Sequence, residues 1–226
     1  MIVPFIGHEL FAVNPNCNIT EESDDYIIID NFYLKYEEIH NILCNMPVPA
    51  WKYNSNSSRN FIDYYDCRPQ LLLSFTKNNV IEHEQVIYNI IASKWREKSP
   101  FAIKTSALEF NYFKLINSSI TEDFQFYPHK DGDYTAIIYL DKISNGGTAF
   151  YEDNEHSCVN YLEKENLFVD VSNLKKTIIQ SAPNRLLIFK GTKVHGGYIN
   201  DHSKFMDNWR INQVVLFAKQ SSQNNC

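Results

Sequence analysis

The sequence predicts a mainly β protein with N-terminal helices (α+β), in which a sandwich or jelly roll fills the C-terminal half. Two stretches before residue 100 place apolar residues at helical spacing. From residue 107 onward, short β-branched and aromatic runs alternate with turn signals, and six of the seven glycines lie between residues 132 and 197. Short strands joined by regular turns are typical of sandwiches and jelly rolls.

The N-terminal half is expected to supply one strand and two helices. Residues 1–23 show no apolar period and are predicted to be irregular, whereas residues 26–30 form a short apolar strand. Residues 33–45 and 80–98 predict helices that end before prolines. Their apolar positions are Tyr36, Ile39 and Leu43 in the first helix, and Val80, Ile87, Ile91 and Trp95 in the second.

The C-terminal half is expected to be a series of short strands. The predicted strands are residues 107–116, 134–140, 148–151, 177–179, 185–189 and 211–217. We expect one domain over residues 1–226, with supporting N-terminal elements in residues 1–104 and a β core in residues 105–218.

Composition and charge exclude several classes of protein. A chain of 226 residues with 44% hydrophobic residues can bury a large core, and a net charge of −6 argues against duplex nucleic acid as a partner. We find neither a span of about 18 apolar residues nor a basic signal-peptide start, so no membrane is expected. The five cysteines contain no C-x-x-C pair and are typical of reduced thiols, which predicts a cytoplasmic location. The sequence leaves the oligomeric state open.

The segment His129-Lys130-Asp131 is the first candidate metal-binding element. In an extended strand, residues i and i+2 point to the same side, so this imidazole and this carboxylate would face one point. A turn after Pro128, with Asp131-Gly132 as its bend, is the alternative interpretation.

A further histidine would complete a facial triad, and His195 is the candidate. It follows an apolar strand and a turn and precedes Gly196-Gly197, whereas His156 and His202 lie in polar stretches typical of the surface. Two histidines and one carboxylate leave coordination positions open on one face, as in non-haem Fe(II) oxygenases.

Arg210 is the candidate anchor for an anionic co-substrate. It opens the predicted strand at residues 211–217, on the side opposite Ile211 and Val215. A guanidinium holds a carboxylate with two parallel hydrogen bonds, as an iron site with a dicarboxylate co-substrate requires. The alternative is a surface ion pair at a strand end.

These segments, taken together and in order, resemble the Fe(II)/2-oxoglutarate-dependent dioxygenase superfamily, on its prolyl-4-hydroxylase-like branch. The resemblance covers residues 105–218 approximately, about half of the chain. Its four pieces are Tyr127-Pro-His-Lys-Asp-Gly132, Gly146-Gly-Thr-Ala-Phe-Tyr151 after the strand at residues 134–140, Pro183-Asn-Arg-Leu-Leu-Ile-Phe189 before His195, and Arg210-Ile-Asn212. Asn212 stands where relatives often have serine, and the 15-residue interval from His195 to Arg210 is longer than in many of them, which leaves Lys204 as an alternative anchor.

The resemblance implies a double-stranded β-helix, a cupin-like jelly roll, with iron bound by His129, Asp131 and His195. It implies that Arg210 pairs with the far carboxylate of 2-oxoglutarate and makes Tyr112 a candidate second contact, unless Tyr112 is simply a core aromatic. The implied cofactors are Fe(II), 2-oxoglutarate and O2, with ascorbate as a candidate reductant. The implied activity is hydroxylation of an unactivated C–H bond, with release of succinate and CO2.

The substrate and two competing functions stay open at this stage. A protein side chain and a small metabolite are both compatible with the sequence as substrates. A non-catalytic cupin-like binding module and an iron enzyme that does not use 2-oxoglutarate are the alternative functions. The intact His129, Asp131 and His195 set argues against the first, because a lapsed enzyme is expected to lose a ligand. Phe126 and Phe150 are candidates for shielding the reaction site.

Overall fold

The computed structural model describes residues 8–45, 52–54, 63–67, 82–98, 101–112, 123–152, 168–205 and 210–219, and only the backbone at residues 8, 52–54, 63–67, 101–102, 104–112 and 168. Its helical elements are η1 (His8–Phe11), α1 (Tyr36–Asn45), α3 (Glu82–Lys94) and η5 (His202–Phe205). Its strands are β1 (Asn18–Glu22), β2 (Tyr26–Asp30), β3 (Lys52–Asn54), β4 (Asp63–Cys67), β5 (Phe101–Tyr112), β6 (Phe124–Phe126), β7 (Tyr134–Tyr139), β8 (Gly147–Tyr151), β9 (Phe168–Asp170), β10 (Lys176–Gln180), β11 (Arg185–Lys190), β12 (His195–Tyr198) and β13 (Arg210–Lys219).

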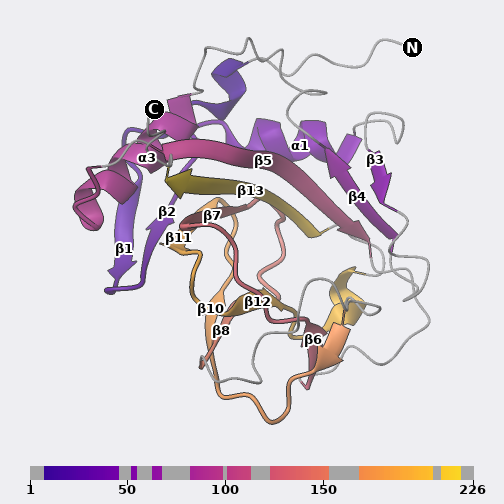
Figure 1. Ribbon diagram of the computed structural model, residues 1–226. Coiled ribbons are helices and arrows are strands. Elements are labelled where there is room, and N and C mark those ends of the chain that lie inside the picture. Colours follow the sequence, from indigo (N-terminus) through magenta and orange to yellow (C-terminus); the bar gives the residue numbers. More distant parts are fainter. Residues whose placement is uncertain are drawn as a thin grey trace, which may run out of the picture.

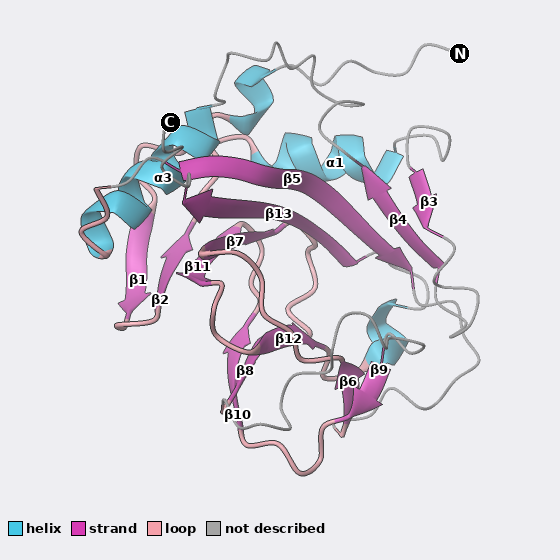
Figure 2. Cartoon of the chain, in the orientation of Figure 1, coloured by secondary structure: helices cyan, strands magenta, loops and turns pink. Residues whose placement is uncertain are grey.

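Two facing sheets form the body of the molecule (Figure 1). The larger sheet has eight strands in the order β1-β2-β11-β7-β13-β5-β4-β3, and the smaller has the order β10-β8-β12. Helices α1 and α3 cover the outer face of the larger sheet, and the smaller sheet lies on its other side (Figure 2). From β7 to β13 the chain passes repeatedly between the two sheets, with antiparallel pairing throughout. This is the predicted double-stranded β-helix.

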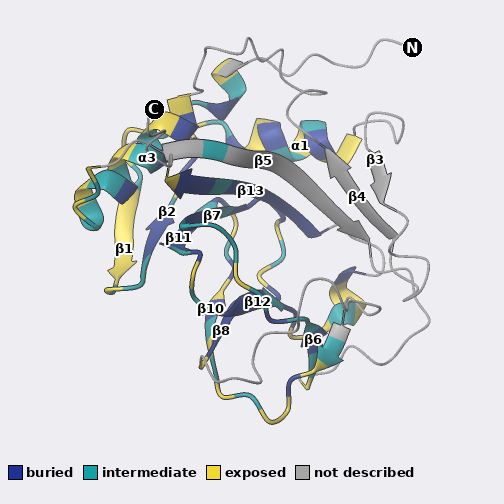
Figure 3. Ribbon diagram, in the orientation of Figure 1, coloured by how far each residue is buried: buried dark blue, intermediate teal, exposed yellow. Residues whose placement is uncertain are grey.

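The central strands are apolar at successive positions because both of their faces are buried (Figure 3). In β11, Leu186 and Ile188 join the core beneath the helices, whereas Leu187 and Phe189 join the core between the sheets. Strand β13 keeps the predicted division: Ile211, Val215 and Phe217 belong to the helix-side core.

The helices occur where apolar spacing predicted them, with shorter bounds. Tyr36, Ile39 and Leu43 of α1 are buried in the helix-side core, as are Ile87 and Ile91 of α3. The predicted starts at residues 33 and 80 lie outside the observed helices, and residue 80 falls outside the described residues. The second helix ends at Lys94 rather than at residue 98.

The prediction that residues 1–23 are irregular is wrong for β1. This strand pairs antiparallel with β2 at the edge of the larger sheet, with a bulge between Ile19 and Glu21. All five residues of β1 are exposed, so the strand has no apolar alternation that a sequence pattern could reveal. The division at residue 104 stays a prediction, although that residue lies within β5.

Gly146, just before β8, and Gly147, its first residue, have positive φ angles of 128° and 153°. A Cβ at Gly147 would lie 1.9 Å from the carbonyl oxygen of Ile179 on β10, so both the backbone angle and the available space require glycine.

We expect Gly147→Ala to lower the free energy of unfolding by about 3 kcal/mol, and the melting temperature by roughly 6–12 °C. Thermal unfolding checks this, with Gly197→Ala as the control, because a Cβ there meets only the Phe126 side chain, at 3.0 Å. Equal losses in both variants would contradict the account.

Candidate metal centre

His129, Asp131 and His195 converge on one point between the sheets. Their ligand atoms all lie within 4.8 Å of one another. His195 Nε2 lies 3.1 Å from Asp131 Oδ2, and His129 Nε2 lies 3.8 Å from Asp131 Oδ1. The sequence analysis singled out these three residues, and the structure brings them together.

Backbone pairing places His129 and His195 side by side although they are 66 positions apart in the sequence. His129 and His195 form an antiparallel bridge, with N–H···O distances of 2.8 Å and 2.9 Å, and their rings are 4.5 Å apart between centroids. The amide of Asp131 donates to the Gly191 carbonyl at 2.9 Å, which ties it to the turn after β11. His195 also packs edge-on against Phe189, with 4.6 Å between centroids.

Backbone carbonyls orient both imidazole rings. His129 Nδ1 lies 3.1 Å from the Tyr127 carbonyl oxygen, and His195 Nδ1 lies 2.9 Å from the Lys193 carbonyl oxygen. A carbonyl can only accept a hydrogen bond, so each Nδ1 donates and each Nε2 is directed toward Asp131. Metal-ligating histidines are typically held in this way, because the hydrogen bond fixes both ring orientation and tautomer.

The surroundings of Asp131 favour its ionised form. Burial raises the pKa of this carboxyl, but the hydrogen bond with His195, the charges of both histidines and the Thr135 hydroxyl outweigh burial and lower it. Thr135 Oγ1 donates to Asp131 Oδ2 at 3.1 Å. A carboxylate with two imidazole nitrogens is a donor set that fits non-haem Fe(II).

Arg210 is buried and faces the smaller sheet. Its Nη2 donates to the Gly147 carbonyl oxygen at 3.4 Å, and its Cζ lies 5.9 Å from the centre of the Phe126 ring. When the Asn212 amide is oriented so that both its atoms find partners, its oxygen accepts from Arg210 Nη1 at 2.6 Å. Neutral oxygens therefore hold the planar guanidinium in place.

Tyr139 and Thr148 are neighbours of this arginine that the sequence analysis missed. Tyr139 pairs in register with Asn212, and its hydroxyl lies 2.8 Å from Thr148 Oγ1 across the two sheets. Burial raises the pKa of Tyr139 to about 12, while the nearby charge of Arg210 acts in the opposite direction. In sequence, Tyr139 belongs to a dense apolar run and resembles any core aromatic.

The remaining sequence candidates lie in varied places. Phe150 packs between the sheets, 5.0 Å from Phe189 between ring centroids. Lys204, the alternative anchor, is exposed in η5, where His202 is also placed. Tyr112 ends β5, but its side chain lies outside the described residues, as does all of His156.

Asp141 lies just after β7 and interacts electrostatically with Arg210. Burial raises the pKa of Asp141 to about 6, although Arg210 and the hydrogen bond from the Ile143 amide (3.1 Å) both favour the carboxylate. Since this pKa is higher in the folded than in the unfolded chain, ionisation of Asp141 reduces stability as the pH rises from about 4 through about 6.

We therefore expect Asp141→Asn to be more stable than the wild type above that range. Asparagine keeps an acceptor oxygen for Ile143 and carries no charge. The gain in the free energy of unfolding should be up to about 3 kcal/mol near pH 8 and close to zero near pH 4. Denaturant titrations at both pH values measure it. A gain that does not change with pH would contradict this assignment.

Within the described part of the chain, none of the helices has both the length and the apolar character needed to cross a membrane.

No protein-family model and no curated protein sequence matches this chain. Solved structures do match. HygX from Streptomyces hygroscopicus, determined with nickel, 2-oxoglutarate and hygromycin B bound, has a TM-score of 0.52 at 9% identity, covering 87% of this chain and 83% of HygX. The epimerase SnoN, determined with Fe3+, alpha ketoglutarate and nogalamycin RO, has a TM-score of 0.50 at 12% identity, covering 87% of this chain and 79% of SnoN.

An oxidoreductase of the 2OG-Fe(II) oxygenase family from Burkholderia pseudomallei has a TM-score of 0.48 at 9% identity, covering 90% of this chain and 93% of that protein. At such identities, the likeness to HygX and SnoN concerns the fold. The chain thus shares the fold of two proteins determined with a metal ion and 2-oxoglutarate or alpha ketoglutarate bound, and its own two sheets form a double-stranded β-helix. The assignment to the prolyl-4-hydroxylase-like branch stays a prediction.

Proposed function

We propose that this protein is a non-haem Fe(II)- and 2-oxoglutarate-dependent oxygenase. We propose further that it hydroxylates an unactivated C–H bond of a protein side chain or a small metabolite, with release of succinate and CO2. The observation that carries the proposal is the convergence of His129, Asp131 and His195 on one point. This donor set occupies a fold whose neighbours include enzymes determined with 2-oxoglutarate or alpha ketoglutarate bound.

The residues present fit the iron. His129 and His195 offer Nε2 atoms whose rings are already fixed through Nδ1, and Asp131 offers a carboxylate that Thr135 orients. These three would hold Fe(II) and leave coordination positions open on one face. When bound, Fe(II) with 2-oxoglutarate and O2 supplies oxidative decarboxylation coupled to oxidation of the substrate.

The position of Arg210 suits a dicarboxylate that also reaches the metal. His195 pairs with Phe150 on β8, and Arg210 donates to Gly147 on the same strand. The metal-binding group and the guanidinium therefore border the same strand of the smaller sheet, at positions three residues apart. Arg210 would bind the far carboxylate, and Asn212 would keep the guanidinium in plane with it.

Asp131 supports hydroxylation rather than halogenation, since halogenases of this fold class have a small residue in place of the carboxylate ligand. The assembled metal-binding set supports an enzyme rather than a binding module. Cys17 and Cys44 are free thiols, in keeping with the cytoplasmic location that we propose.

Turnover of 2-oxoglutarate tests the activity without knowledge of the substrate. Purified protein is incubated with Fe(II), ascorbate and 2-oxoglutarate in air, and succinate is measured against His129→Ala protein, which lacks a candidate ligand and whose partly exposed side chain can be removed without a buried cavity. We expect succinate to form faster with the wild type, because slow decarboxylation proceeds without substrate. Iron-loaded wild type that forms no more succinate than the variant would contradict the proposal.

Peptides and small metabolites can then be screened for substrates that accelerate succinate release. A true substrate should gain one oxygen atom derived from isotopically labelled O2. If a product forms together with succinate but contains no labelled oxygen, the reaction is a different oxidation and not hydroxylation.

A further inference from the structure

One four-residue turn contacts two of the three candidate ligands. In the turn from Lys190 to Lys193, the Gly191 carbonyl accepts the amide proton of Asp131 at 2.9 Å. The Lys193 carbonyl accepts from His195 Nδ1 at 2.9 Å. The turn is closed by the Lys193 amide donating to the Lys190 carbonyl at 3.0 Å. A displacement of this turn would therefore move a carboxylate ligand and rotate an imidazole ligand together.

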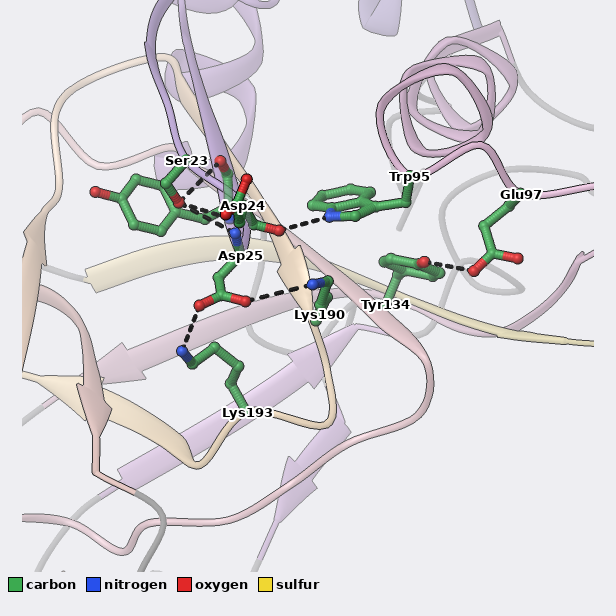
Figure 4. A network of polar contacts seen from close by, with 9 residues as sticks. Ser23, Asp24, Asp25, Trp95, Glu97, Tyr134, Lys190 and Lys193 are labelled. Carbon is green, nitrogen blue, oxygen red and sulfur yellow. Dashed lines mark hydrogen bonds and ion pairs between the residues drawn. The ribbon is translucent and has the colours of Figure 1, made fainter.

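Asp25, from the distant N-terminal part of the chain, holds both ends of that turn (Figure 4). Its carboxylate oxygens accept from Lys193 Nζ at 2.6 Å and from Lys190 Nζ at 3.4 Å. Its backbone carbonyl also accepts the Lys190 amide proton at 3.1 Å. Three contacts from Asp25 thus hold Lys190 and Lys193, and the Gly191 carbonyl lies between these two residues.

Asp25 itself lies in a braced segment between β1 and β2. Ser23 Oγ accepts from the amides of Asp25 (3.2 Å) and Tyr26 (3.1 Å). Trp95, just after α3, donates from its indole nitrogen to the Asp24 carbonyl at 2.8 Å. The indole ring lies 4.9 Å from the Tyr134 ring between centroids, on the strand that follows Asp131 (Figure 4).

We propose that Asp25 is a positioning residue for the metal centre, acting through the Lys190–Lys193 turn on Asp131 and His195. The inference rests on the proposed function. An ion pair at half-exposed side chains contributes little to global stability. The Asp25 contacts instead act on geometry, because the positions of Asp131 and His195 depend on the backbone carbonyls that accept their hydrogen bonds.

The chain offers a matched control in Asp30. Asp25 directly precedes β2, and Asp30 is the last residue of that strand. Both carboxylate oxygens of Asp30 accept hydrogen bonds from the Arg185 guanidinium, at 2.7 Å and 2.9 Å. Both aspartates therefore pair with basic residues of β11 or its following turn. Of the two, Asp25 is the one that contacts the turn beside the metal site.

The test is a titration of metal-free protein with Co(II), followed by its visible absorption, for wild type, Asp25→Ala and Asp30→Ala. Loss of a partner directly hydrogen-bonded to a ligand typically weakens metal binding 10–100-fold, so we expect about 3- to 10-fold weakening for Asp25→Ala, one contact further away. The Co(II) band intensities should change as well. Asp30→Ala should bind Co(II) within about 2-fold of the wild type, even where its melting temperature falls further.

Lys193→Met approaches the same contact from the other side. It should reproduce the loss, and the double variant with Asp25→Ala should lose no more than either single variant. Unchanged Co(II) affinity in both single variants would overturn the proposal. It would also be overturned if Asp30→Ala lost Co(II) affinity in the same proportion to its fall in melting temperature as Asp25→Ala does. If wild-type protein binds no Co(II), the proposed function itself fails, and this inference with it.

Discussion

Replacement of His195 by alanine should weaken binding of Fe(II) or Co(II) by at least about 100-fold, beyond the effect of losing a supporting partner. His195 supplies one of three ligand atoms, and its Nε2 lies 3.1 Å from the Asp131 carboxylate. With His195 removed, one imidazole and one carboxylate remain, a pair that water ligands readily replace. Anaerobic titration with metal, followed by absorption or calorimetry, measures the change.

Two further variants distinguish the loss of a metal ligand from a loss of folding. His195 is buried against Phe189, so its removal also leaves a cavity. The His129 side chain is 27% exposed, so His129→Ala should fold well and lose metal to a similar degree. His202→Ala, in η5, serves as the control and should bind metal normally. Metal affinity within about 3-fold of wild type in both site variants would contradict the assignment of these ligands.

Arg210→Met should lower the affinity for 2-oxoglutarate by about 150- to 5000-fold and leave metal affinity unchanged. Methionine approximates the length of the arginine stem but donates no hydrogen bonds. The far carboxylate of the co-substrate would then be buried without its charged partner, which typically costs about 3–5 kcal/mol. Calorimetric titration of 2-oxoglutarate into protein loaded with Ni(II) measures this affinity without turnover.

Arg185→Met provides the comparison for Arg210. Arg185 is the other described arginine on a strand of the larger sheet, and it pairs with Asp30 away from the candidate site. Its loss should reduce stability slightly and leave 2-oxoglutarate affinity as it was. If Arg210→Met bound 2-oxoglutarate as the wild type does, Arg210 would not be the anchor, and Lys204 would become the candidate. Wild-type protein that binds metal but no 2-oxoglutarate would instead favour an iron enzyme with a different co-substrate.

The convergence of the three candidate ligands could be predicted from sequence, because their chemistry is expressed in side chains and in strand periodicity. His129 and Asp131 are separated by one residue, and His195 follows an apolar strand by a short turn. Strands β2 and β11 were equally predictable, since burial on both faces demands continuous apolar runs.

The groups that orient the ligands could not be predicted in this way. The carbonyls of Tyr127 and Lys193 hold the two imidazoles, and a backbone carbonyl carries no side-chain signal. Asp25 reaches the turn beside the site through contacts that depend on how the N-terminal hairpin pairs with β11 at the edge of the larger sheet. Tyr139 differs from a core aromatic through neighbours that only the fold brings to it, Asn212 on the adjacent strand and Thr148 across the two sheets.

The measurement that tests the central claim most directly is the visible charge-transfer band of 2-oxoglutarate chelated to Fe(II). Fe(II) and then 2-oxoglutarate are added to the purified protein without oxygen, and the absorption is followed. We predict a band that saturates with 2-oxoglutarate, is weaker at equal concentration in Arg210→Met, and is absent in His129→Ala. Protein shown to hold one iron per chain that develops no band would contradict the account.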